Sequence, residues 1–184
     1  MSQPLRLLRP LSLGLWALCA MSIFLSAPAR ATTMEEVDLK AAYIYNFIQF
    51  IEWPGGESGT RHEMTVCVSP FSPLKRPLTA LEGKQTSKGA TVRVKLLEIT
   101  DLRPCRVVVL YSSDVVAALR LLRTLPPGHG ILTITDELTF VDPEIVIALS
   151  QQEGRIVFGI SADAAARAGL SISSRLLRLA KVTR

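Results

Sequence analysis

The run Arg106-Val107-Val108-Val109-Leu110-Tyr111 decides the fold of this chain. Three consecutive β-branched residues followed by leucine, without polar alternation, are typical of a strand that is buried on both faces of a sheet. Met64 to Val68 (MTVCV) and Ile131 to Thr135 (ILTIT) have the same character. Because such strands need helices on both faces, the chain is expected to fold as an α/β protein with these runs inside its sheet.

Further strands extend this sheet on both sides. Thr91 to Leu96 alternates apolar and polar residues, as a half-exposed strand does. Ile145 to Leu149 and Arg155 to Ile160 flank the polar segment Ser150 to Gly154, which predicts an antiparallel hairpin with a longer loop. The expected architecture is therefore a three-layer α/β sandwich: a mixed sheet of about five to six strands with helices on both faces.

Four shorter helices are expected after the first strand. Phe71 to Leu81 is interrupted by prolines, so any helix there is short. Ser112 or Ser113 can cap a helix that follows the central strand. Asp163 to Ala168 is an alanine-rich turn of helix, and a last helix is expected to begin near Ser171.

A long N-terminal helix is expected from Thr32 to about Glu52, where Pro54 stops it. One apolar stripe at helical spacing consists of Val37, Ala41, Ile44, Ile48 and Ile51. A second stripe beside it consists of Tyr43, Phe47 and Phe50. The apolar face is wider than one packing contact needs. Either the rest of the domain wraps this helix or part of it meets another protein, and the sequence leaves both open.

The first 31 residues have the pattern of a secretion signal. Arg6 and Arg9 form a positive start, Leu11 to Leu25 is an uncharged apolar run, and Ala29-Arg30-Ala31 fits a signal-peptidase site. The run is short for a bilayer span, which needs about 20 residues. We expect cleavage near Ala31, with an uncleaved anchor as the alternative. Residues 32–184 then form a single domain outside the cytoplasm.

Export leaves two cysteines and little net charge in the mature chain. Cys19 departs with the signal, while Cys67 and Cys105 remain and are expected to form a disulfide in an oxidising compartment. Two separate buried thiols are the alternative. Three arginines also depart, so the excess of Lys and Arg over Asp and Glu falls to two. This balance does not indicate nucleic-acid binding.

Recognisable catalytic or metal-binding patterns are missing from the sequence. It contains no G-x-S-x-G, P-loop or G-x-G-x-x-G motif. His62 and His129 have no base or ligand partner at motif spacing. Asp136 follows a strand and is expected to be a cap rather than an acid-base residue. Arg175 and Arg178 make the C-terminal tail basic, which suits a helix C-terminus or an anionic partner. We therefore expect a binding protein that is not an enzyme and holds no cofactor or metal.

Several segments, in order, resemble the YfiR family of periplasmic proteins. The helix end F-I-E-W-P and the tail A-G-L-x-I-S-S-x-L-L-x-L-A carry most of the resemblance. The matching segments are Lys40 to Phe47, Phe50 to Pro54, Cys67-Val68, Cys105, Gly130 to Asp136, Arg155 to Ile160 and Ala168 to Ala180.

The resemblance implies a regulator that binds and represses an inner-membrane diguanylate cyclase with a GGDEF domain. Repression lowers cyclic-di-GMP signalling and biofilm formation, and an outer-membrane lipoprotein can relieve it. A homodimer is also implied. The partner interface we expect consists of Tyr43, Phe47, Phe50, Trp53, Arg175 and Arg178.

A small-ligand sensor is the alternative function. An α/β sandwich offers a crevice at its strand ends, here expected near Asp136 and Arg155. This crevice is the place to look for a bound periplasmic metabolite.

Overall fold

The computed structural model describes residues 32–55, 63–137 and 142–183. The expected signal peptide and His62 lie outside these ranges. The described helices are α2 (Thr32–Gln49), α3 (Lys75–Thr79), α4 (Val115–Leu122), α5 (Ala162–Arg167) and α6 (Ser174–Leu179). The described strands are β1 (Ile51–Glu52), β2 (Glu63–Val68), β3 (Thr91–Leu96), β4 (Val107–Leu110), β5 (Leu132–Thr135), β6 (Ile147–Gln152), β7 (Arg155–Ile160), β8 (Ser171–Ile172) and β9 (Val182–Thr183).

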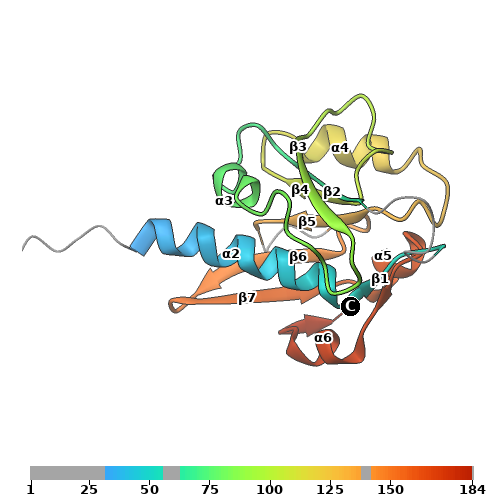
Figure 1. Ribbon diagram of the computed structural model, residues 1–184. Coiled ribbons are helices and arrows are strands. Elements are labelled where there is room, and N and C mark those ends of the chain that lie inside the picture. Colours follow the sequence, from blue (N-terminus) through green and yellow to red (C-terminus); the bar gives the residue numbers. More distant parts are fainter. Residues whose placement is uncertain (1–31, 56–62, 138–141, 184) are drawn as a thin grey trace, which may run out of the picture. The chain divides into compact units, whose positions relative to one another are not determined.

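The main sheet is mixed, with the strand order β3-β2-β4-β5-β6-β7-β9 (Figure 1). Strands β3 to β6 are parallel, β7 is antiparallel to β6, and β9 is parallel to β7. Six of these strands have four or more residues, and β9 adds two residues at one edge. The mixed sheet expected from the sequence is confirmed.

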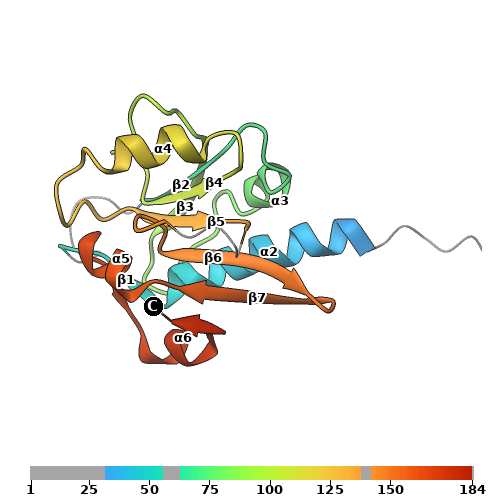
Figure 2. The same ribbon diagram turned by 180° about the vertical axis from the view of Figure 1, so that it is seen from behind.

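Helices pack on both faces of the sheet. Val107 and Val109 of β4 contribute to the cluster that contains α2, α3 and α5, while Val108 and Leu110 contribute to the cluster that contains α4. All four side chains are fully buried. Figure 1 shows α2 passing in front of β6 and β7, and Figures 1 and 2 show α4 beyond β2 and β4, away from α2. The expected three-layer sandwich is confirmed, because strand alternation sends neighbouring valines to opposite layers.

The hairpin between β6 and β7 has a tighter turn than the sequence suggested. Its two central residues, Glu153 and Gly154, have φ angles of 50° and 74°. Positive φ at both positions matches the right-handed twist of the flanking strands. The strand pairing therefore continues through the polar residues to Gln152 opposite Arg155. The expected longer loop is wrong, because polar side chains on an exposed hairpin end do not stop backbone pairing.

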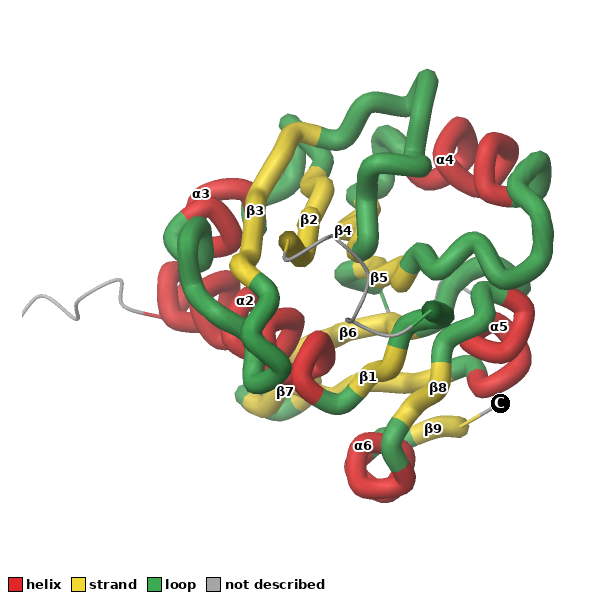
Figure 3. Tube along the Cα trace, turned by 45° about the vertical axis from the view of Figure 1, so that its right-hand side comes forward, coloured by secondary structure: helices red, strands yellow, loops and turns green. Residues whose placement is uncertain are grey.

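A small two-stranded sheet joins the end of α2 to the chain before α6. Ile51 pairs with Ile172, and Glu52 pairs with Ser171 (Figure 3). The helix expected to reach Glu52 thus ends at Gln49, and the helix expected near Ser171 begins at Ser174. Both bounds were wrong for the same reason. The residues that would have formed the last turn of α2 and the first turn of α6 pair with each other as β1 and β8 instead.

A serine caps α6, but the serine cap expected for the helix after the central strand is wrong. Ser173 accepts a hydrogen bond from the Leu176 N–H at 3.3 Å and caps α6. For α4 the N-cap is Asp114 instead of Ser112 or Ser113, and its side chain forms no capping hydrogen bond. Capping geometry depends on where the strand ends, which composition alone does not determine.

His129 lies in the loop that leads into β5. Its Nδ1 accepts a hydrogen bond from the Ile131 N–H at 3.1 Å, so Nδ1 carries no proton. Burial lowers the pKa of His129 below its usual value, and the charge of Glu144 opposes this shift. The folded state therefore binds fewer protons here than the unfolded state as the pH falls.

We expect His129 to make the protein less stable as the pH falls below the ordinary histidine pKa of about 6.5. Burial lowers the pKa of His129 in the folded state, so above pH 6.5 the imidazole is neutral in both states and costs no stability. Below that pH the unfolded state binds the proton more readily, and the free energy of unfolding falls. Urea unfolding across this range measures the effect. His129→Asn keeps an acceptor for Ile131 but does not titrate, and an unchanged pH profile in this variant would contradict the assignment.

Candidate partner-binding surface

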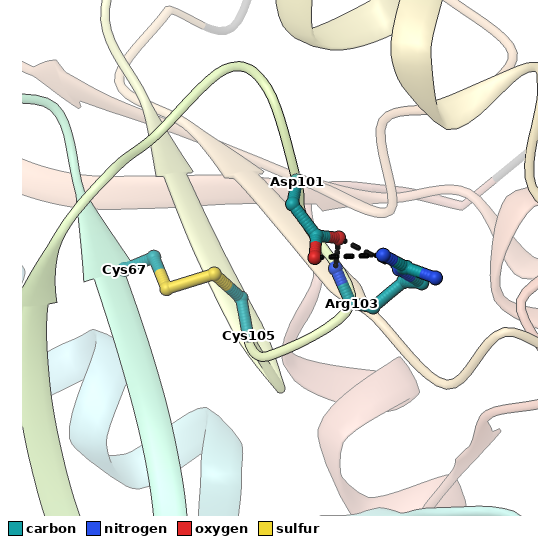
Figure 4. Close-up of a disulfide and its surroundings, with 4 residues drawn as sticks. All are labelled: Cys67, Asp101, Arg103 and Cys105. Atoms are coloured by element: carbon teal, nitrogen blue, oxygen red, sulfur yellow. Dashed lines mark hydrogen bonds and ion pairs between the residues drawn. A yellow bond between two sulfur atoms is a disulfide. The ribbon is translucent and has the colours of Figure 1, made fainter.

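The disulfide expected from the sequence is present between β2 and the segment before β4. Cys67 and Cys105 have Cα atoms 5.7 Å apart and are 2% and 4% exposed (Figure 4). The bond joins a central strand to residues 97–106, which lead from β3 to β4. Asp101 and Arg103 form an ion pair in the same segment, at 2.8 Å. The disulfide thus supports the fold and adds no reactive thiol.

Helix α2 is held along two of its sides. The Tyr45 hydroxyl donates to the Gln85 carbonyl at 2.6 Å, and the Ser87 N–H donates to Gln49 Oε1 at 2.5 Å. On its other side, α2 contacts Phe158 of β7 through its aromatic residues. The helix therefore leaves only part of its circumference to solvent.

Two of the expected interface aromatics belong to the core of this chain. Phe47 is 1% exposed and lies 4.9 Å from Phe158 between ring centroids. Trp53 is 7% exposed. Tyr43 and Phe50 are half-buried, and Tyr43 meets both Phe47 and Phe158 edge to face. Only Tyr43 and Phe50 of the four aromatics can contact a partner without rearrangement.

Leu39 is the residue that sequence reasoning missed on α2. Its side chain is 41% exposed, one helical turn before Tyr43. The signal was present in the spacing, since positions 39, 43, 46 and 50 fall on one side of a helix. We define the α2 stripe as Leu39, Ala42, Tyr43, Asn46 and Phe50. Each of its members is exposed or half-buried, and none carries a charge.

Lys40 keeps its charge away from this stripe. Its ammonium lies 2.6 Å from Glu36 Oε1 and 2.6 Å from Asp136 Oδ1, and its side chain is 8% exposed. Asp136 follows β5, so the ion pair attaches the first half of α2 to the end of that strand. The expected capping role of Asp136 is thereby replaced by a bond to a distant lysine. No sequence motif pairs two residues so far apart.

Burial and pairing act in opposite directions on the pKa of Lys40. Burial alone lowers it, but the hydrogen bonds to Asp136 and Glu36 outweigh burial and raise it. Burial also raises the pKa of Asp136, and the adjacent lysine opposes that shift. Lys40 is therefore a firmly protonated cation that compensates a carboxylate removed from water.

Arg175 and Arg178 are both exposed on α6. The fold brings this helix to the end of α2, because the Ser173 N–H donates to the Phe50 carbonyl at 3.0 Å. The aromatic and basic parts of the expected interface therefore adjoin at Phe50, although they come from opposite ends of the sequence.

A small polar cavity lies at the same junction. It has a volume of about 130 Å³ and is lined by Gln49, Phe50, Glu52, Lys88, Ser171 and Ser173. Ligand sites for drug-sized molecules are larger, on the order of 300–1,000 Å³. The crevice expected near Asp136 is instead the place where Asp136 binds Lys40.

A family model described as YfiR/HmsC-like matches residues 37–181. The chain belongs to the YfiR/HmsC-like family. The match includes most of α2, both disulfide cysteines and α6, so the domain described above is the family domain. Members of this family are periplasmic, and the family is regulatory and non-catalytic. No curated protein matched the chain when sequences were compared.

Two further observations concern membranes and metals. Within the described parts of the YfiR/HmsC-like domain, no helix combines the length and apolar character needed to cross a bilayer. Across those same residues, no three His, Cys, Asp or Glu side chains gather in a way that could hold a metal ion.

Proposed function

We propose that this YfiR/HmsC-like protein binds and represses an inner-membrane diguanylate cyclase by contacting its periplasmic part. Membership of a periplasmic regulatory family supports this proposal. Export by residues 1–31 with cleavage near Ala31, a homodimeric state and release by an outer-membrane lipoprotein belong to the same proposal. Repression would lower cyclic-di-GMP and, with it, biofilm formation.

The observation that carries the proposal is the uncharged surface of the second half of α2, after Lys40. No charged residue occurs between Lys40 and Glu52, and the Lys40 ammonium is turned inward to Asp136. An exposed helix face is ordinarily rich in charged residues. Depletion of charge combined with aromatic side chains is instead the composition of the centre of a protein–protein interface. We therefore assign the α2 stripe to the cyclase contact.

The small cavity beside Phe50 supports a ligand sensor less well. At about 130 Å³ it has room for a few water molecules, each of which occupies about 30 Å³ in the liquid. Lys88, which lines the cavity, donates its ammonium to the Ile51 carbonyl at 3.1 Å, so one of its polar groups is already bonded within the chain.

Replacing Leu39 and Asn46 by glutamate is expected to weaken cyclase binding at least tenfold, because two charges would be buried without partners at the contact. Both positions are exposed, so the free energy of unfolding should change little. Isothermal titration calorimetry measures the affinity for the purified periplasmic part of a GGDEF protein encoded by a neighbouring gene. Urea unfolding checks the stability of the variant.

Phe71→Glu is the matched control for this experiment. Phe71 is 71% exposed and lies in the loop after β2, away from α2 in sequence and on a different element. Its replacement introduces the same kind of charge on an apolar surface position. Unchanged affinity in Leu39→Glu/Asn46→Glu, or an equal loss in Phe71→Glu, would remove the α2 stripe from the interface.

A further inference from the structure

The charge of the mature chain is concentrated at its C-terminal end. Residues 155–184 contain six basic residues and one acidic residue, whereas residues 32–154 contain twelve basic and fifteen acidic residues. The small overall excess of positive charge therefore hides two parts of opposite sign.

The fold brings four of these six basic residues to α6 and the neighbouring edge of the sheet. Leu176 is 3% exposed and packs against the core, whereas Arg175, Arg178 and Leu179 of the same helix are exposed. Leu179 is 66% exposed, one turn after Arg175. Figure 2 shows α6 beside β7 at the edge of the domain. The helix thus presents an exposed apolar side chain next to two exposed arginines.

Lys181 extends this surface onto the edge of the main sheet. Its N–H donates to the Phe158 carbonyl at 2.9 Å, and its ammonium donates to the side chain of Gln152. Gln152 pairs across the hairpin with Arg155, which brings that arginine to the same edge. We define the α6 surface as Arg155, Arg175, Arg178, Leu179 and Lys181.

The cations of the α6 surface are available for an external anion. Within the described part of the chain, Arg93, Arg103 and Arg123 form ion pairs with carboxylates, whereas the cations of the α6 surface form none. The acidic residues nearest along the described ladders are Glu52, which pairs with Ser171, and Glu153 in the turn before Arg155. Neither is bonded to an arginine of α6.

We propose that the α6 surface binds an anionic phospholipid bilayer, with Leu179 entering the interface between the headgroups. Exposed arginines next to an exposed leucine fit a lipid surface, because headgroup phosphates bind the guanidinium groups while the apolar side chain enters the acyl boundary. An acidic protein surface would pair with the arginines but would offer no apolar contact for Leu179. The inference rests on the proposed function in one respect: export to the periplasm would place the protein beside such a bilayer.

Co-sedimentation with lipid vesicles tests this directly. Protein purified from the periplasm is mixed with vesicles of phosphatidylglycerol and phosphatidylethanolamine, or with vesicles of phosphatidylcholine alone. We expect binding to the anionic vesicles only, with release at high salt. Arg175→Gln/Arg178→Gln should lower the partition coefficient about twenty-fivefold, because each cation contributes a factor of about five. Leu179→Ser should lower it about fivefold.

Lys75→Gln/Arg120→Gln is the matched control, since it removes two exposed cations from α3 and α4. This variant should keep its vesicle binding within about twofold, because its charges lie outside the α6 surface. Absence of binding to anionic vesicles, equal binding to phosphatidylcholine, or an equal loss in the control would overturn the proposal. None of these results depends on cyclase binding, so a failed α2 contact and a failed membrane contact are separate outcomes.

Discussion

Replacing Cys67 and Cys105 together by alanine is expected to lower the free energy of unfolding by about 4 kcal/mol. The bond closes a loop across a sequence separation of 38 residues, so its loss releases that segment in the unfolded chain. Both cysteines are almost completely buried beside α4 and the central strands, which adds the loss of packed sulfur atoms. For a domain of this size, such a change is a large fraction of total stability.

Urea unfolding of the oxidised wild-type protein and of the variant measures this difference. Wild-type protein unfolded with a reductant provides the matched comparison, because it loses the bond but keeps both sulfur atoms. Most of the destabilisation should appear in that sample, while the variant should not respond to reductant. A reduced wild type as stable as the oxidised one would show that the bond contributes nothing to folding.

Replacing Lys40 by methionine is expected to cost about 3 kcal/mol, because removal of one member of a buried ion pair leaves an uncompensated charge. Asp136 and Glu36 would then face each other without the ammonium that lies 2.6 Å from each of them. The side chains of Asp136 and Glu36 are 15% and 26% exposed, so solvent relieves only part of this cost.

The pH dependence of the Lys40→Met variant has a definite sign. Burial already raises the pKa of Asp136, and without Lys40 its carboxyl group would be still harder to ionise. A carboxyl group with a raised folded-state pKa contributes stability below its unfolded pKa and loses it as the pH rises. The variant should therefore lose stability as the pH rises above about 4, more steeply than the wild type.

The triple variant Lys40→Met/Glu36→Gln/Asp136→Asn separates charge from packing. With no ionised group left at this position, most of the stability should return, and the added pH dependence should disappear. Urea unfolding at several pH values gives both quantities. If the single and triple variants were equally unstable at every pH, packing of the lysine stem would explain the loss instead of charge compensation.

The strands and their burial could be predicted from the sequence, because the pattern of polar and apolar residues in each run reflects how deeply that strand is buried. Val107 to Leu110 lacks polar residues, so it had to lie inside a sheet covered on both faces, and it does. The alternation in Thr91–Leu96 likewise predicted a half-exposed strand, and β3 is one, at the edge of the sheet. The pairing of Cys67 with Cys105 was favoured over two separate thiols by the expected compartment and by counting, without any knowledge of geometry.

The exposed residues of the candidate surface could be predicted only in part by the same reasoning. The second stripe of α2 was visible, but Phe47 and Trp53 could not be distinguished from Tyr43 and Phe50, because burial depends on Phe158 from the distant strand β7. Leu39 was overlooked even though its spacing placed it beside Tyr43. The inward turn of Lys40 depends on Asp136, almost one hundred residues later.

The sequence by itself determined the α/β class, the identity of the buried strands, the disulfide and the basic C-terminal end, because these are properties of local composition and period. The tertiary structure alone decided which side chains of α2 remain exposed, where Lys40 places its charge, and how α6 comes to adjoin the end of α2. These features arise from contacts between segments far apart in the chain, such as β1 with β8, whose register no local pattern specifies.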